Sequence, residues 1–285
     1  MLARAAPFLF VFLWSTGFLG AKLGMPHAAP LAFLFVRYLL VIGLMTMLVL
    51  ALRAPWPRDG RQWFHVGVSG LLVHALYLGG VFTAISAGLP AGVTSLVVGI
   101  QPLLTATIAG RLLGETVLAR QWFGLVLGFL GVALVVSNKL ATVTGGFDFG
   151  ALWPALAALL GITTGTLYQK RFCPHFDWRS GSVAQFLPAA VITGLVVFAT
   201  DSYRIDWTGE FLFALGWLVL VLSIGAISLL NWLIRHGSAV NVASLFYLTP
   251  PTTALLAWLL FGETLTGLAL FGMALAVWGV YLSRR

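Results

Sequence analysis

The sequence predicts an all-α membrane protein of ten transmembrane helices, arranged as two inverted repeats of five helices. Its 285 residues are 60% hydrophobic and only 8% charged. Ten apolar stretches follow one another along the chain, and the second half repeats the first at an offset of 148 residues. Because soluble domains contain about 25% charged residues, this chain cannot cover itself with a water-facing surface.

The apolar stretches have the length of membrane-spanning helices. A barrel strand would show roughly ten residues of alternating hydrophobicity, whereas each run here is unbroken and about 20 residues long. We expect the first helix to be retained, because nine further spans follow and no small-residue cleavage site is evident. The expected helices are 5–24, 31–52, 63–87, 91–110, 119–137, 149–169, 181–200, 211–234, 239–260 and 265–282.

The internal repeat divides the chain into residues 1–140 and 147–285. The matches at the offset of 148 include Thr16-Gly17 with Thr164-Gly165, Lys22 with Lys170, Pro102 with Pro250, and Gly114-Glu115-Thr116 with Gly262-Glu263-Thr264. Because each half holds an odd number of spans, the second copy enters the membrane from the opposite side. Inverted repeats are common in secondary transporters, which hold the substrate between the halves. The repeat therefore indicates a membrane carrier.

Basic residues indicate the orientation. Most of the 16 Lys and Arg residues fall in loops on one side, while only Lys22, Lys139 and Arg204 fall on the other. The positive-inside rule then places both termini in the cytoplasm, and we expect a bacterial inner (plasma) membrane. A net charge of +8 would suggest a nucleic-acid partner in a soluble protein, but here the charges lie in short loops. We expect no such partner.

Prolines and a repeated Gly-Glu-Thr motif mark breaks and corners. Pro102 and Pro250 lie inside spans 4 and 9, where each removes a backbone hydrogen bond and kinks its helix. Such broken helices commonly line the path of a carrier, although a kink used only for packing is the alternative. We interpret Gly-Glu-Thr as a structural corner, since a carboxylate at a helix mouth satisfies orphan amide donors and complements the dipole.

These features resemble the EamA-type members of the drug/metabolite transporter superfamily. The resemblance rests on Leu-Trp-Ser-Thr-Gly-Phe at 13–18, the proline-kinked span, and the Gly-Glu-Thr corner before a Gly-spaced final span, and it covers both halves. It implies a ten-helix inverted-repeat fold, alternating access, and a central cavity bordered mainly by helices 1, 3, 4, 6, 8 and 9. It also implies export of amino acids and related metabolites as the commonest activity, without fixing the substrate.

Polar and aromatic side chains inside the spans are candidates for a binding site, because a polar group in hydrocarbon is costly and usually faces a cavity or partner. In span 4, Thr94, Val98, Gln101 and Thr105 form one stripe. Serines and threonines could instead bond to their own helix, and aromatics could face lipid. The predicted substrate-binding residues are Trp14, His74, Tyr77, Gln101, Thr164, Tyr168, Ser228, Asn231 and Tyr247.

Several classes of chemistry are disfavoured. No Asp or Glu falls inside a predicted span, so a polycationic substrate would find no carboxylate there. A sugar phosphate needs converging cations, yet only Arg37 lies well inside a span, and its repeat partner is Gln185. We expect Arg37 to point inward or to the periplasmic interface, with snorkelling and substrate contact both open. No nucleophile–base set or metal cluster is evident, so we expect neither an enzyme nor a cofactor.

The sequence thus predicts a monomeric secondary transporter that exports small amino acids or similar amphipathic metabolites across the lipid bilayer. Neutral polar groups can hold a zwitterion by their dipoles while aromatic walls accept its side chain. The alternative is efflux of neutral or weakly charged hydrophobic drugs, which would use mainly the aromatic surface. If transport is proton-coupled, His74 is the candidate proton carrier, because histidine titrates near neutrality; we favour uncoupled transport.

Overall fold

The computed structural model describes residues 2–89, 91–140, 149–200, 202–262 and 264–284. Within these residues the regular secondary structure is helical, apart from one isolated β-bridge between Ala28 and Ile205. Eight of the described helical stretches are long and apolar enough to cross a membrane. The segment at 152–172 is long enough but less apolar, and the last helix, Gly267–Ser283, is shorter. The all-α prediction is confirmed, while ten crossing helices stay a prediction.

The first half contains five helical stretches, two of which are interrupted. The elements are α1 (Leu2–Gly24), a 3-10 turn (Met25–His27), α2 (Pro30–Ala51), α3 (Gly60–Gly70), a π-helical segment (Leu71–Leu78), α4 (Gly79–Ser86), α5 (Ala91–Val98), α6 (Gln101–Leu113) and α7 (Ala119–Leu140). Because α3, the π-helical segment and α4 follow one another directly, they form one long rod.

The second half has the same order of α-helices and one π-helical segment, but its 3-10 turns lie at other places. They are a 3-10 turn (Phe149–Ala151), α8 (Leu152–Phe172), α9 (Trp178–Ala199), α10 (Gly209–Trp217), a second π-helical segment (Leu218–Ala226), α11 (Ile227–His236), α12 (Ala239–Ser244), a 3-10 turn (Leu245–Leu248), α13 (Thr249–Phe261) and α14 (Gly267–Ser283). Here α10, the π-helical segment and α11 form the long rod.

The irregularities of the two halves occur at equivalent positions. Adding 148 to the first π-helical segment gives 219–226, which the second segment contains. Pro102 and Pro250 each lie in the first turn of a new helix, α6 and α13, after the preceding segment has ended. Both of these helices then end at a glycine in the left-handed conformation, Gly114 (φ 70°) and Gly262 (φ 67°), where other residues are strained. The backbone therefore follows the same 148-residue repeat as the sequence.

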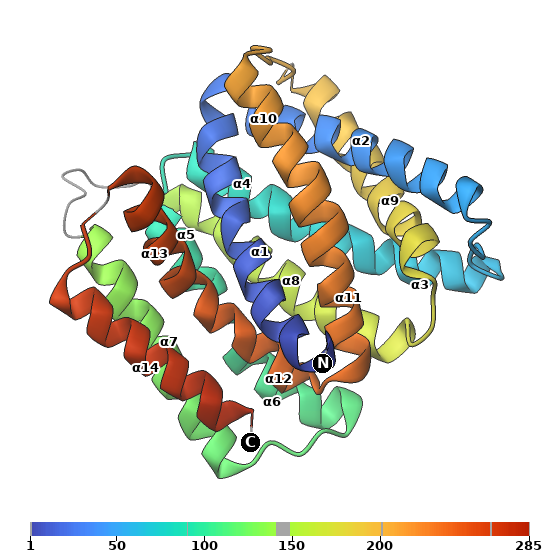
Figure 1. Ribbon diagram of the computed structural model, residues 1–285. Helices are drawn as coiled ribbons and strands as arrows, with labels where there is room; N and C mark the ends of the chain where they lie inside the picture. The colour runs from blue at the N-terminus through green and yellow to red at the C-terminus, as the bar shows by residue number, and fades with distance from the viewer. Residues whose placement is uncertain (1, 90, 141–148, 201, 263, 285) are drawn as a thin grey trace.

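Figure 1 shows both chain termini at one end of the bundle, together with the start of α12 and the α6–α7 loop. We call this the terminal end and the opposite one the distal end. Lys170 bonds to the backbone just before α12, at the terminal end. Its repeat partner, Lys22, lies in the last turn of α1, at the distal end. Equivalent residues thus lie at opposite ends, as an inverted repeat requires.

Helices α7 and α14, which are equivalent in the two halves, pack closely along one edge of the bundle (Figure 1). Glycines on each helix face the backbone of the other. A Cβ added to Gly131 would lie 2.6 Å from the Gly272 carbonyl oxygen, and one added to Gly124 would lie 2.6 Å from the Gly279 oxygen. Small residues give this close approach, which is how helices commonly associate within a bilayer.

Candidate substrate cavity

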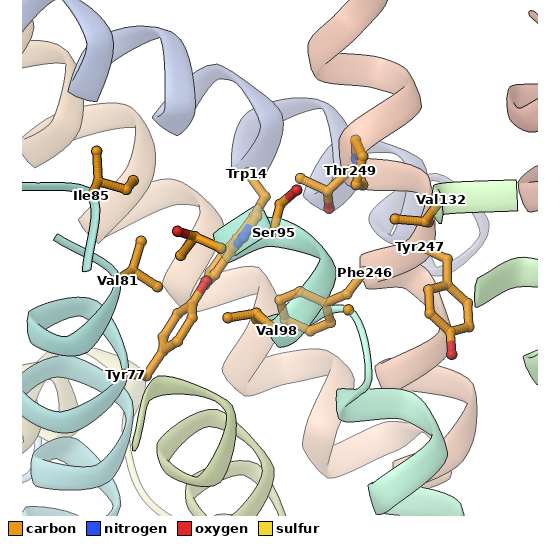
Figure 2. Close-up of a pocket in the computed structure, with 13 residues that line it drawn as sticks. Trp14, Tyr77, Val81, Ile85, Ser95, Val98, Val132, Phe246, Tyr247 and Thr249 are labelled. Carbon is orange, nitrogen blue, oxygen red and sulfur yellow. The ribbon is translucent and has the colours of Figure 1, made fainter. Parts of the chain in front are cut away.

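A cavity lies where α1, the first long rod and the two proline-broken helices meet, and Figure 2 shows its lining. We call it the main cavity. Its empty space, the mouth included, is about 520 Å³. Ile85, near the end of α4, and Thr94, near the start of α5, place it toward the distal end. The lining residues are Trp14, Tyr77, Val81, Ile85, Thr94, Ser95, Val98, Gly99, Val132, Phe246, Tyr247, Thr249 and Pro250.

Aromatic rings form one wall of the main cavity. The Trp14 and Tyr77 rings stack, with centroids 6.4 Å apart and planes 12° apart. Phe246 meets Trp14 edge-on at 5.3 Å. Figure 2 shows Trp14, Tyr77 and Phe246 around the same space, with Tyr247 farther out on the α7 side. Such a wall offers a large apolar surface with a preferred ring geometry for a ligand's hydrocarbon part.

Two hydroxyl groups of the lining have no hydrogen-bond partner although they are buried. They are the Tyr247 phenol and the Thr249 hydroxyl. Ser95, by contrast, donates to the Gly92 carbonyl at 2.8 Å. Buried polar groups nearly always have a hydrogen-bond partner in folded proteins. Two hydroxyls without a partner in a cavity wall are therefore suited to a ligand that carries its own polar groups.

A second, smaller cavity lies at the equivalent position on the other side of the repeat. Its empty space is about 230 Å³. Thr94, Ser95 and Val98 of the main cavity correspond at the offset of 148 to three of its residues, Val242, Ala243 and Phe246. Its full lining is Gln101, Thr166, Lys170, Ile234, Ala239, Val242, Ala243 and Phe246. The two cavities therefore share several repeat-related positions, but they differ in size and in the rest of their linings.

Glu115 of the first Gly-Glu-Thr motif contacts two residues that line the smaller cavity, Ala239 and Lys170. Both of its carboxylate oxygens accept from the Ala239 N–H, each at 2.9 Å, at the first residue of α12. Lys170 Nζ lies 3.8 Å from Glu115 Oε1 and also donates to the carbonyls of Ile234 and Gly237. The expected structural corner is thus seen at Glu115, although the helix that it caps belongs to the other half. Glu263, in the second copy of the motif, lies outside the described residues.

Three buried amides form a closed ring between α8, α9 and α11. Gln169 donates to Asn231 at 2.9 Å, Asn231 donates to Gln185 at 3.2 Å, and Gln185 donates back to Gln169 at 3.1 Å. Gln185 also donates to Ser69 in α3 at 3.1 Å. Each amide has its partners inside the protein, so this ring joins four helices and leaves Asn231 engaged.

Of the predicted binding residues, Trp14, Tyr77 and Tyr247 line the main cavity, and Gln101 lines the second one. Both polar atoms of the Gln101 amide are buried without a partner. The sequence also named Thr94 and Val98 as one stripe with Gln101, and those two line the main cavity. Sequence reasoning missed Phe246, which could have been found as the repeat partner of Val98.

The structure does not bring the other predicted residues into either cavity. Thr164 is exposed and donates to the Leu160 carbonyl at 2.6 Å, because Gly161 and Gly165 turn the neighbouring face of α8 toward the first π-helical segment. Tyr168 bonds to His65 Nδ1 at 2.6 Å, outside both cavities. The Ser228 hydroxyl is buried without a partner and lines neither cavity.

His74 and Arg37 are buried in the core beside the main cavity. The His74 ring stacks on Phe186, with centroids 3.9 Å apart, and neither ring nitrogen has a partner. Arg37 is only 1% exposed, and its Nε donates to Ser223 Oγ at 2.8 Å. The guanidinium thus points inward to a polar partner and does not snorkel outward.

A family model described as EamA-like transporter family matches residues 4–137 and 148–285. This chain belongs to the EamA-like transporter family. The family model matches once in each half, and its two matches correspond to the repeat seen in the backbone.

Its curated relatives are named as transporters. The uncharacterized inner membrane transporter YedA of Escherichia coli is 27% identical, over 97% of this chain and 91% of that protein. The uncharacterized transporter YvbV of Bacillus subtilis is 28% identical, over 95% and 88%. A probable amino-acid metabolite efflux pump of Salmonella typhimurium is 26% identical, over 96% and 92%. The chain is therefore an integral membrane transporter of the drug/metabolite type.

A solved structure also shares the fold. It is described only as "Crystal structure of protein", and it aligns with a TM-score of 0.79 and 21% sequence identity. The alignment covers 98% of this chain and 94% of that one, so the whole helical bundle is a known architecture.

Proposed function

We propose that this protein is a secondary transporter that exports small amino acids or similar amphipathic metabolites by alternating access through the main cavity. The observation that carries the proposal is the pair of repeat-related cavities, of about 520 and 230 Å³. In an inverted repeat, the two halves can exchange conformations, which would shrink the main cavity and enlarge the second. The substrate would then pass from one end of the bundle to the other.

The lining of the main cavity supports an amphipathic substrate. Trp14, Tyr77 and Phe246 can accept an apolar side chain, while the unpaired Tyr247 and Thr249 hydroxyls can bond to its polar groups. One relative is named a probable amino-acid metabolite efflux pump, which supports this substrate class and the direction of transport. We expect the carrier to be monomeric, uncoupled from protons and free of cofactor or enzymatic activity.

The membrane orientation is part of the same proposal. With both termini in the cytoplasm, the terminal end is cytoplasmic and the distal end is periplasmic. The main cavity then faces the periplasm, and the Glu115–Lys170 closure seals the cytoplasmic side. A C-terminal reporter fusion active only in the periplasm would contradict this orientation.

Efflux of neutral or weakly charged hydrophobic drugs is the second candidate, and the largely apolar lining favours it. The two candidates differ in their need for hydroxyl groups. Thr249→Val keeps the side-chain shape and removes one hydroxyl, which should weaken amino-acid binding by about 1 kcal/mol, or about fivefold, and leave drug flux unchanged. Thr164→Val is the matched control, since Thr164 is exposed and bonds to its own helix.

The test is a counterflow screen of amino acids, nucleosides and hydrophobic drugs in proteoliposomes. We expect amino-acid counterflow above empty vesicles, abolished by Trp14→Ala and reduced by Thr249→Val but not by Thr164→Val. Clear uptake of another class with no amino-acid uptake would contradict the proposal. Drug uptake that tolerates Thr249→Val would establish the second candidate in its place.

A further inference from the structure

We propose that Arg37 is the anchor for a carboxylate group of the transported substrate, so that the protein selects metabolites carrying a carboxylate. This inference rests on the proposed function, because it names the anionic part of the molecule that the same site would carry. Arg37 lines neither cavity in this conformation. Its burial, its hydrogen-bond partners and its position in the repeat support the proposed role.

Arg37 is a buried cation without a carboxylate partner in the part of the chain that the structure describes. The ion pairs there join His27 to Glu210, Lys170 to Glu115, Arg179 to Asp177 and Arg204 to Asp206. Arg37 has the neutral Ser223 hydroxyl on Nε, and its buried Nη2 has no partner. A buried charge is costly unless it is paired. A ligand anion would supply the missing charge and the missing acceptor.

The repeat shows what a completed version of this position looks like. Gln185 is equivalent to Arg37, and each donates to a serine of the opposite half, Arg37 to Ser223 and Gln185 to Ser69. At Gln185, the amide ring with Gln169 and Asn231 satisfies the remaining atoms. At Arg37, the buried Nη2 atom has no such internal partner. At this position the first half thus carries a charged residue with an unpartnered buried atom, whereas the second half carries a neutral amide whose partners lie within the protein.

The surroundings of Arg37 connect it to the main cavity. Ser223 lies in the second π-helical segment, while His74 and Tyr77, which are near enough to interact with the Arg37 charge, lie in the first. Such segments occur frequently at functional sites. Tyr77 also lines the main cavity, so one residue borders the cavity and lies near the guanidinium. The proposal requires that a shift of one of these segments during transport bring Nη2 to the substrate.

A single guanidinium fits a monoanion such as a carboxylate, which it can bind with parallel N–H···O bonds. A phosphate carries more charge and needs further cations. Arg37 is the one Lys or Arg well inside a predicted span, so the sequence offers no second cation there. His74, with both ring nitrogens unpartnered, is a further donor within the same neighbourhood.

The experiment compares acids with their amides on the purified full-length protein. Two pairs keep the hydrocarbon part constant: leucine with leucinamide, and 4-methylpentanoate with 4-methylpentanamide. Binding is measured by thermal shift in a chloride-free buffer, and transport by counterflow in proteoliposomes. For the wild type, we expect each acid to bind about 10- to 100-fold more tightly than its amide, the range for a hydrogen bond to a charged group.

The decisive variant is Arg37→Gln, which copies the residue at the equivalent position. It can still donate to Ser223, so we expect it to fold, with a melting temperature without ligand equal to or above that of the wild type. It should lose the preference for acids over amides. Ser223→Ala is the matched control: it removes the internal partner but keeps the charge, and the acid preference should remain.

Each outcome separates this inference from the proposed function. If amino acids are carried but acids and amides behave alike, or if Arg37→Gln keeps the acid preference, the anchor is refuted while amino-acid transport stands. If no amino acid is carried but 4-methylpentanoate stabilises the wild type and not Arg37→Gln, the anchor stands and the amino-acid substrate fails. Stabilisation by sodium chloride equal to that by the acids would assign the position to an inorganic anion and overturn the inference, as would the absence of any acid effect.

Discussion

Replacing Glu115 by Gln should loosen the closure of the terminal end. The carboxylate accepts from the Ala239 N–H with both oxygens and faces Lys170 at 3.8 Å. Its side chain is 18% exposed and that of Lys170 is 20% exposed, so water screens the pair only in part. Glutamine keeps one acceptor for the N–H but loses the charge. We expect a loss of about 1–2 kcal/mol of closure free energy, within the range for charge-assisted hydrogen bonds and partly exposed ion pairs.

That loss shifts the balance between closed and open conformations by about 5- to 30-fold. The assay is the rate at which a membrane-impermeant maleimide labels Ala243→Cys, since Ala243 is buried in the smaller cavity. The native cysteine gives little background, because burial raises the pKa of the Cys173 thiol to about 12 and keeps it protonated at neutral pH. We expect Glu115→Gln to raise the Ala243→Cys labelling rate from the terminal side by the same factor.

The matched control is Ser95→Cys, at the equivalent position in the main cavity. Opening of the terminal end should be coupled to closing of the distal end, so labelling of Ser95→Cys should fall under Glu115→Gln. If both rates stay constant while the variant melts at the wild-type temperature, Glu115 is a helix cap with no part in closure. If both rates rise together, the variant is partly unfolded and the coupling between the two ends is refuted.

Two further predictions concern stability. Gly131→Leu should destabilise the protein by about 1–3 kcal/mol or more, because its Cβ would lie 2.6 Å from the Gly272 carbonyl oxygen, whereas Gly43→Leu, with no atom within 4 Å, should leave the melting temperature nearly unchanged. The side-chain bond from Arg179 holds the pKa of Asp177 below its usual range, so the stability from this carboxylate is present at neutral pH and is lost as the pH falls through that lowered pKa. Between about pH 5 and pH 3, the melting temperature of Asp177→Asn should therefore fall less than that of the wild type. Equal falls in the two melting temperatures would refute this linkage.

Much of the fold could be predicted because it follows from composition and chain-wide repetition. Predictions of individual site residues are wrong where they assume that a helical period continues across a break in the helix. The stripe from Thr94 to Gln101 assumes one continuous helix, but the helix is interrupted between Val98 and Gln101, ahead of Pro102. The helical period does not carry across the break, so Gln101 lines the second cavity and Thr94 the main one.

Other features of the site could not be predicted because they depend on contacts between segments that are distant in the sequence. Asn231 has its partners at Gln169 and Gln185, 62 and 46 positions away, and no local pattern indicates that three amides meet. The π-helical segments are similarly absent from the sequence pattern, because the apolar runs that contain them look like ordinary helices. The first segment packs against α8 and α9 and the second against α1 and α2, so the contacts of each come largely from the opposite half.

The inverted repeat gives a way to separate residues that serve the conformational cycle from those that serve the substrate. Positions with the same backbone role in both halves include Gly114 and Gly262 and the breaks before Pro102 and Pro250. Under the proposed alternating access they are needed twice, because each half would adopt both conformations. Positions where the halves differ are free of that requirement. Arg37 and Gln185 occupy equivalent positions in the two halves. Of the two, only Arg37 has a buried side-chain atom without a hydrogen-bond partner. A substrate has no internal two-fold symmetry, so its recognition must depend on such differences.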